Sequence, residues 1–194
     1  MIVPDTKDWT WVLDQRCPDC GFDARSCPQG EVAGLVRANA RRWQNLLADG
    51  RIRPGRPDDD TWSSLEYACH VRDVYRIYRS RIALMLRDDD PPFDNWDQDV
   101  TALAERYDEQ APELVVAELA EAAKAMATQL DQLTDSQWQR PGRRGDGASF
   151  QINTIARYMV HDPVHHIWDV SGRPATDDGG TTDSRHARSR RQRR

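Results

Sequence analysis

The spacing of apolar residues constrains the fold of this chain more than any other feature. Four segments, at residues 31–49, 61–90, 111–133 and 148–170, repeat apolar side chains at steps of three and four, as on one face of an α-helix. No window shows the sustained alternation of a β-strand. The pattern predicts an all-α four-helix bundle with helices of about 18 to 25 residues and a site among facing helices. A shorter helix is expected between the second and third segments.

Composition divides the chain into three parts. Residues 28–170 hold the periodic segments and are expected to form one bundle domain. Residues 1–27 are expected to be an irregular extension that contains a CxxC motif. Residues 171–194 lack apolar periodicity and are predicted to be a disordered basic tail, since residues 183–194 hold six Arg and one Asp although the whole chain carries a net charge of −5.

Charge and hydropathy exclude several functional classes. An acidic body with a short basic end is a poor match for a nucleic-acid surface, although the tail alone could contact RNA, DNA or an acidic protein. No uncharged apolar run approaches the ~20 residues needed to cross a bilayer, and no leader pattern opens the chain. Four cysteines fit a reduced compartment better than a disulfide framework. We expect a cytoplasmic protein with a small-molecule substrate; a homodimer is left open.

Three histidines are the strongest functional signal. His161 and His165 are four residues apart on the last predicted helix and share one face, and His70 lies in the apolar arc of the second. Two imidazoles from one helix and a third from another can hold a divalent cation and leave a fourth position open. The pattern favours a metal site at His70, His161 and His165 over three hydrogen-bonded core histidines. His166 is turned about 100° from His165 and is interpreted as a flanking residue or as one that contacts a metal ligand without binding the metal.

Pro163 lies between the paired histidines. It removes a backbone donor, and Asp162 with Pro163 is also a start signal for a new helix. A break at this point would separate the two imidazoles, whereas a kink would leave both facing inward. The sequence leaves these two outcomes open.

Other polar side chains are candidates for roles around the metal. Glu66 and Asp73 lie one turn either side of His70, and Asp169 lies one turn after His165, so each could accept a hydrogen bond from an imidazole N–H. Ordinary solvated carboxylates are the alternative. Tyr158 could direct a hydroxyl toward the open position, although packing is the usual role of a tyrosine there.

The segment CPDCGFDARSC is interpreted separately. CxxC is half of a structural zinc site, but its usual second half, another CxxC or an HxxxH free of other duty, is missing. Cys17, Cys20 and Cys27 are therefore assigned a structural or unliganded role, with structural zinc and redox chemistry as the alternatives.

The motifs WSSLEYACHVRDV and HDPVHH together resemble the DinB/YfiT-like superfamily of metal-binding four-helix bundles, particularly its actinobacterial members. The resemblance covers about residues 28–170. It implies that His70, His161 and His165 bind a divalent metal, zinc or nickel, and that Pro163 does not destroy the site. Members with known activity are largely thiol-dependent transferases and isomerases that use bacillithiol, mycothiol or glutathione, and others have no assigned activity.

These observations together predict a metal-dependent enzyme. The expected activity is S-transfer from a low-molecular-weight thiol such as mycothiol, with the thiol at the open position of the metal and a thiolate formed near neutral pH. Two alternatives are kept open. One is a non-catalytic metal-binding stress protein or sensor, and the other is an interaction module that acts through its basic tail.

Overall fold

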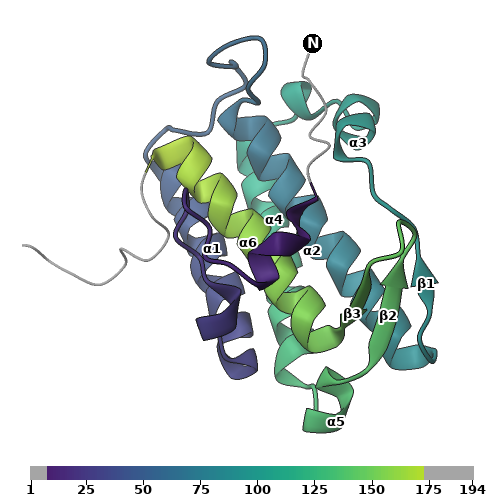
Figure 1. Cartoon of the computed structure of the whole chain (residues 1–194). Helices are drawn as coiled ribbons and strands as arrows, with labels where there is room; N and C mark the ends of the chain where they lie inside the picture. Colours follow the sequence, from purple (N-terminus) through teal and green to yellow (C-terminus); the bar gives the residue numbers. More distant parts are fainter. Residues whose placement is uncertain (1–7, 173–194) are drawn as a thin grey trace, which may run out of the picture.

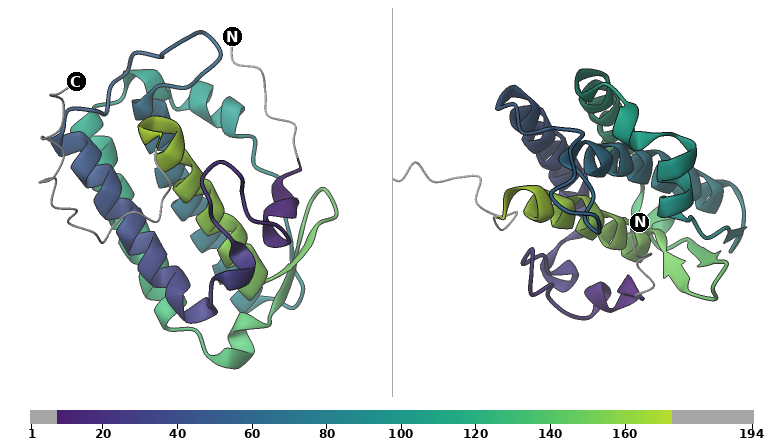
Figure 2. Two further views of the ribbon diagram at one scale, coloured as in Figure 1. Left: turned by 60° about the vertical axis from the view of Figure 1, so that its left-hand side comes forward. Right: turned by 90° about the horizontal axis from the view of Figure 1, so that it is seen from above.

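A computed structural model describes residues 8–172 of the chain (Figure 1). Four long helices form its body and confirm the predicted bundle: α1 (Val32–Ala48), α2 (Ser64–Arg87), α4 (Pro112–Asp131) and α6 (Ile152–Ser171). Both α4 and α6 pack against α1 and α2, so α1 and α2 take diagonal positions (Figure 2). Most of the predicted tail, residues 173–194, lies outside the described residues.

The helix ends follow from local sequence signals. Ser63 and Glu66 form a capping box that starts α2, three residues later than the sequence pattern placed it. Pro112 occupies the first turn of α4, where its missing N–H costs nothing. Gly172 ends α6 with a left-handed φ of 63°, a conformation that glycine adopts without strain.

Helix α6 runs without a break through Pro163. Nδ2 of Asn39 donates a hydrogen bond of 2.7 Å to the Pro163 carbonyl, and the Tyr75 hydroxyl donates to Oδ1 of Asn39 at 3.0 Å. All of these groups are buried. Packing against α1 and α2 therefore holds the helix together at the proline, and residues on either side of it keep one helical phase.

A small sheet at one end of the bundle was not predicted. Strands β1 (Pro92–Phe93) and β2 (Pro141–Arg144) pair in parallel, and β2 pairs antiparallel with β3 (Ser149–Gln151). Strands this short cannot show an alternating pattern in the sequence. Gly142 lies so close to α2 that an added Cβ would be 2.7 Å from Cγ of Met85. Glycine is therefore needed where β2 meets the bundle.

Short elements complete the fold. The expected fifth helix is present as α3 (Gln98–Ala104), followed by η4 (Tyr107–Glu109), and α5 (Asp135–Trp138) precedes β2. From residue 8 to the start of α1, the N-terminal segment contains only the short 3₁₀ helices η1 (Trp9–Leu13), η2 (Ala24–Ser26) and η3 (Gln29–Glu31). Figure 2 shows this segment lying along α6, and both η1 and η2 contact that helix.

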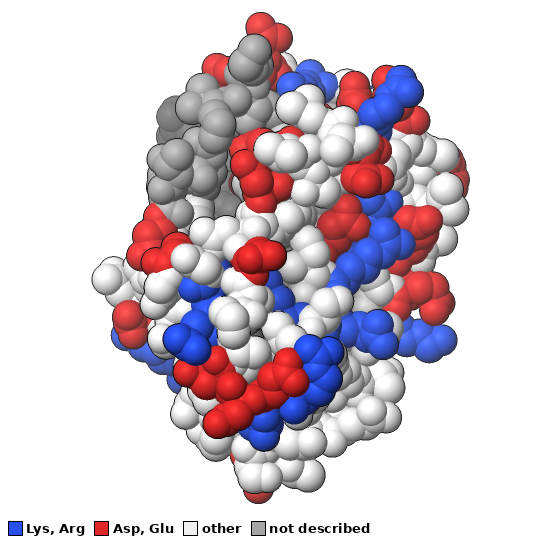
Figure 3. Space-filling view, turned by 90° about the vertical axis from the view of Figure 1, so that its right-hand side faces the viewer, with Lys and Arg blue, Asp and Glu red and all other residues white. Residues whose placement is uncertain are grey.

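The surface carries mixed charge. On the face formed by the sheet and α3, acidic and basic side chains are intermingled (Figure 3). Several are paired, among them Arg143 with Asp90 and Arg144 with Asp146. Of the helices that the structure describes, none combines the length and apolar character of a membrane span.

Candidate metal centres

Helix α6 carries two interleaved pairs of candidate metal ligands. His161 and His165 share one face, and Asp162 and His166 share the next, about 100° further round the helix. The pairs therefore have different nearest neighbours, although all four side chains reach the wall of one cavity. Within residues 8–172, two groups of His, Cys and acidic side chains bring their ligand atoms within 4.8 Å of one another, and each group contains one of these pairs.

The first group, which we call the pocket triad, consists of His70 of α2 with Asp162 and His166 of α6. Nε2 of His70 lies 3.1 Å from Oδ1 of Asp162, and Nε2 of His166 lies 3.4 Å from the same oxygen. Burial would raise the pKa of Asp162, but the neighbouring His70 and His166 rings outweigh it and hold that pKa well below its usual range. Asp162 is thus an ionised carboxylate between two imidazoles.

The pocket triad has the donors and spacing that a divalent cation requires. Two ligand atoms about 2.1 Å from one cation lie about 3.0 Å apart at a right angle and about 3.4 Å apart at the tetrahedral angle. The two separations at Asp162, 3.1 and 3.4 Å, fall in this range. Two imidazoles and one carboxylate are ligands used by catalytic zinc and by non-haem iron, with positions left open for substrate. The residues present therefore fit a divalent metal.

Asp169 orients the last member of the pocket triad. Its Oδ2 lies 2.7 Å from Nδ1 of His166, which leaves Nε2 directed toward Asp162. A carboxylate at this position fixes the imidazole tautomer and raises its basicity. The sequence associated Asp169 with His165, but Nε2 of His165 is 3.7 Å from Oδ1 of Asp169, so the closer partner is His166.

The two carboxylates expected beside His70 have other partners. Glu66 pairs with Arg56, and Asp73 pairs with Arg72. Nδ1 of His70 is buried and has no hydrogen-bond partner among residues 8–172. Glu66 and Asp73 therefore stabilise the fold and do not orient His70, which corrects the expectation from their spacing.

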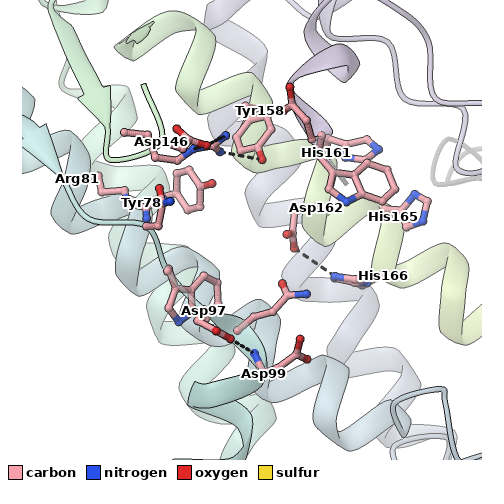
Figure 4. A pocket seen from close by; sticks show the side chains of 16 residues that line it. Tyr78, Arg81, Asp97, Asp99, Asp146, Tyr158, His161, Asp162, His165 and His166 are labelled. Atoms are coloured by element: carbon pink, nitrogen blue, oxygen red, sulfur yellow. Dashed lines mark hydrogen bonds and ion pairs between the residues drawn. The ribbon is translucent and has the colours of Figure 1, made fainter. Parts of the chain in front are cut away.

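A cavity of about 610 Å³ opens beside the pocket triad (Figure 4). Asp162 and His166 point into it from α6, and the side chain of Asp162 is 34% exposed. His70 is fully buried behind them, with its ring stacked on Trp96 at 5.1 Å between centroids. The wall is completed by side chains from η1 and its cap, α2, the loop before α3 and its start, β2 and the turn after it, and α6, which are Asp8, Trp9, Tyr78, Arg81, Asn95, Trp96, Asp97, Gln98, Asp99, Arg144, Asp146, Tyr158, His161 and His165.

Tyr158 lies in the cavity wall one turn before Asp162. Nη1 of Arg144 donates a hydrogen bond of 3.2 Å to its hydroxyl oxygen, and Arg144 in turn pairs with Asp146. Burial raises the pKa of Tyr158, against the opposing effect of Arg144. The hydroxyl is therefore protonated at neutral pH and can donate a hydrogen bond into the cavity. The predicted role of Tyr158 in catalysis stays a prediction.

The second group, which we call the Cys2His2 group, joins the N-terminal segment to the other face of α6. It consists of Cys17, Cys20, His161 and His165, with Sγ of Cys17 3.6 Å from Nδ1 of His165. Burial raises the pKa of Cys20 to about 12 and lowers the pKa of His161 to about 4. Cys27, which follows in the same segment, is also buried but does not belong to the Cys2His2 group.

The structure thus divides the predicted three-histidine set between two groups. His161 and His165 lie together as expected, with ring centroids 5.2 Å apart, but His70 groups with Asp162 and His166 instead. The reason is helical phase: the face of α6 that meets α2 is the one carrying Asp162 and His166. Metal binding itself stays a prediction for either group.

Sequence reasoning missed Asp162 and His166 as candidate ligands. The sequence pattern indicates Asp162 only as a helix-start signal, and His166 as a flanking residue or a residue that supports a ligand. The signal that could have found them is a second pair at the same i,i+4 spacing, shifted by one residue from His161 and His165. For Cys17 and Cys20, the missing half of a zinc site is the pair His161 and His165. The sequence pattern did not indicate this because it assigned both histidines to a site with His70.

A four-helix bundle with candidate metal ligands on its last helix defines the class of this protein. A family model described as the DinB superfamily matches residues 37–170, and the chain belongs to that superfamily, which confirms the resemblance seen in the motifs. Among solved structures, YfiT from Bacillus subtilis matches with a TM-score of 0.65 and 17% identity, over 74% of this chain and 86% of that one. YfiT is described as a probable metal-dependent hydrolase with an unusual four-helix bundle topology. Comparison with curated proteins gives no match.

Proposed function

We propose that this chain is a metal-dependent enzyme that transfers a small thiol to an electrophilic co-substrate at the pocket triad. One observation carries the proposal: an ionised carboxylate and an imidazole on the wall of a cavity of about 610 Å³ lie against a second, buried imidazole, with their ligand atoms within 4.8 Å of one another. Cavities of about 300 to 1,000 Å³ are typical of small-molecule sites. A non-catalytic metal protein has no need of such a cavity.

The residues of the pocket triad have distinct tasks in this proposal. His70, Asp162 and His166 would hold a divalent cation, which we expect to be zinc or nickel, and Asp169 would keep His166 in the right tautomer. A cation held there lowers the pKa of a coordinated thiol or water so that its conjugate base forms near neutral pH. Because His70 is fully buried, water is excluded from its side of the pocket triad.

Tyr158 and Arg144 are proposed to act on the co-substrate. The protonated Tyr158 hydroxyl, held by Arg144, can donate to the leaving atom of the electrophile, an epoxide oxygen or a chloride, which takes the electron pair of its breaking bond to carbon as the carbon–sulfur bond forms. Trp9 lies on the same wall, on the N-terminal side of the cavity. Together these groups orient the electrophile and limit access of bulk water.

The carboxylates of the cavity are engaged with other groups, so activation of the nucleophile falls to the metal. Attack by water gains from a general base, but the nearby carboxylates already have partners. Asp8 accepts from Thr10, Asp97 caps α3, and Asp146 pairs with Arg144. A metal-bound thiol or water, whose pKa is already lowered, needs no such base. The polar wall also suits a thiol that carries hydroxyl groups, such as mycothiol.

Metal-dependent hydrolysis is the second candidate. It is favoured by the likeness to YfiT, described as a probable metal-dependent hydrolase, and by the ligand set, since two histidines and a carboxylate also hold zinc in several hydrolases. At 17% identity the likeness supports a shared fold, and the reaction has to be tested directly.

We also propose a cytoplasmic location, and a homodimer is left open. The cysteines of the described chain are free thiols, which supports a reducing, cytoplasmic setting. A homodimer stays a prediction, and three exposed apolar side chains, Val100 and Leu103 of α3 and Leu114 at the start of α4, offer a surface for contact. A role as a metal-binding stress protein or a tail-driven interaction module is an outcome of the test below.

The test compares thiol-dependent and thiol-independent turnover. Protein purified without chelator is incubated with mycothiol, bacillithiol or glutathione and an aryl chloride or epoxide, and the S-conjugate is measured. A parallel panel of esters, amides and phosphoesters is assayed without thiol. The proposal expects conjugation that His166→Ala lowers at least a hundredfold, with His186→Ala as the matched control. Thiol-independent hydrolysis lost in the same variant would favour the second candidate.

A lack of turnover in both panels, with metal retained, would support the non-catalytic alternative. The interaction module is tested separately by removing residues 173–194. Loss of a bound partner with unchanged metal content would show that the tail is responsible. Unchanged turnover in the shortened chain is the result that the enzyme proposal expects.

A further inference from the structure

We infer that Cys17, Cys20, His161 and His165 form a closed structural Zn²⁺ site, distinct from the pocket triad, that fastens the N-terminal segment to α6. The four side chains offer two sulfurs and two nitrogens within 4.8 Å of one another. The inference does not depend on the reaction proposed for the cavity, because none of its ligands belongs to the pocket triad.

The spacing of the donors fits a zinc ion. With Zn–S of about 2.3 Å and Zn–N of about 2.0 to 2.1 Å, a sulfur and a nitrogen at the tetrahedral angle lie about 3.5 Å apart. Sγ of Cys17 and Nδ1 of His165 are 3.6 Å apart. This separation is long for a strong hydrogen bond but natural for two ligands of one zinc ion.

A tight turn presents both cysteines from the same side. The N–H of Gly21 donates to the Cys17 carbonyl at 3.0 Å, and the N–H of Cys17 donates to the Phe22 carbonyl at 2.8 Å. Gly21 has φ of 78°, which glycine adopts at little cost. The chain therefore reverses directly after Cys20, as a CxxC turn must do for both sulfurs to reach one ion.

Burial supplies an independent observation. Cys17 and Cys20 are fully buried, and His161 is 4% exposed. Nε2 of His161 is buried and has no hydrogen-bond partner within residues 8–172. A buried imidazole nitrogen without a partner is unfavourable, and coordination to a cation would satisfy it.

The ligand set indicates a structural role. Four protein donors fill the tetrahedral shell of zinc and leave no position for substrate, whereas the pocket triad supplies only three. Two thiolates also select zinc over the harder divalent ions that bind oxygen. Binding releases the two thiol protons, so the loaded site holds Zn²⁺ with two thiolates and two neutral imidazoles and has no net charge.

The site would hold part of the cavity wall in place. The described part of the segment before α1 contains only three short 3₁₀ helices, which give it little backbone stability of its own. Trp9 of η1 lines the cavity, and its ring centroid lies 5.6 Å from that of His161 and 5.5 Å from that of His165. Zinc would therefore secure η1 against α6 and fix the edge of the cavity.

The test isolates the Cys2His2 group by removing the pocket triad. In the double variant His70→Ala, His166→Ala, purified anaerobically without chelator, we expect about one equivalent of zinc to remain. X-ray absorption at the zinc edge should show two sulfur and two nitrogen neighbours. This readout uses the intact Cys2His2 group, so it does not depend on whether a cysteine variant folds.

Cysteine variants provide the second measurement. Co²⁺ in the same double variant should give a thiolate-to-metal charge-transfer band, and this band should be lost when Cys17 is changed to Ser. Cys27→Ser is the matched control, since Cys27 is a buried cysteine of the same segment outside the group, and it should leave the band unchanged.

Two results would overturn the inference. One is a zinc site with no sulfur neighbour, and the other is a Cys17–Cys20 disulfide in anaerobically purified protein that holds no metal. Failure of the proposed function would look different: the double variant would keep its zinc and sulfur signals while the wild-type protein showed no turnover in any panel.

Discussion

Asp169 lies between the two proposed metal sites, and its substitution should affect them unequally. Its Oδ2 is 2.7 Å from Nδ1 of His166, the distance of a strong charge-assisted hydrogen bond. Its Oδ1 is 3.7 Å from Nε2 of His165, beyond ordinary hydrogen-bond range. We therefore expect Asp169→Asn to weaken metal binding at the pocket triad and to leave the Cys2His2 group nearly unchanged.

The expected size of the effect follows from these contacts. Loss of a carboxylate that orients a ligating histidine costs about 10- to 100-fold in metal affinity, or about 1.4 to 2.7 kcal/mol. Asn keeps the shape of Asp and an oxygen that can accept from His166, so Asp169→Asn should lie near the lower limit. Asp169→Ala removes the acceptor altogether and should approach the upper limit.

The assay measures the two sites separately in one protein. Competition between the protein and a chromophoric chelator gives the affinity of the pocket triad, and the thiolate band of Co²⁺ reports the Cys2His2 group. Asp146→Asn is the control, because Asp146 lines the same cavity but pairs with Arg144 and no histidine. Equal losses in the Asp169 and Asp146 variants, or a loss confined to the thiolate band, would refute the reasoning.

Three further predictions concern the fold and the reaction. Asp73→Asn removes one of the two carboxylates paired with the buried Arg72, which keeps Glu118, and should lower the free energy of unfolding by about 1 to 3 kcal/mol in urea titrations. Burial would raise the pKa of Asp73, but Arg72 and Tyr107 outweigh it, and the pKa of Asp73 is lowered overall. The stability that ionised Asp73 gives the fold is therefore fully present above its unfolded pKa of about 3.9 and is lost progressively as the pH falls below that value. An acid titration of the free energy of unfolding measures this loss. Asn39→Ala should cost about 1 to 3 kcal/mol in the same urea assay, because it leaves buried polar partners unsatisfied. Tyr158→Phe should lower turnover about 10²-fold while the metal content, measured by mass spectrometry, stays the same.

The bundle could be predicted because apolar periodicity is a local property of the sequence. Each long helix shows its own repeat and its own start or stop signals, and none depends on a distant residue. The three-stranded sheet was missed because β1 and β2 are too short to show a pattern and pair only after the chain has folded.

The histidines could be selected from the sequence, but their grouping could not. The stretch HDPVHH contains two i,i+4 pairs one residue apart, and the sequence does not state how far α6 is rotated against α2. That rotation is set by packing, including the contact of Asn39 with the Pro163 carbonyl. The link between Cys17 and His165 spans 148 residues and has no local signal.

The central claim is that α6 supplies one ligand pair to each of two metal sites, and a crystal structure of zinc-loaded protein tests it most directly. Anomalous scattering at the zinc edge should give two peaks. One should lie among His70, Asp162 and His166, and the other should lie within the Cys2His2 group. A single peak bounded by His70, His161 and His165 would contradict the account.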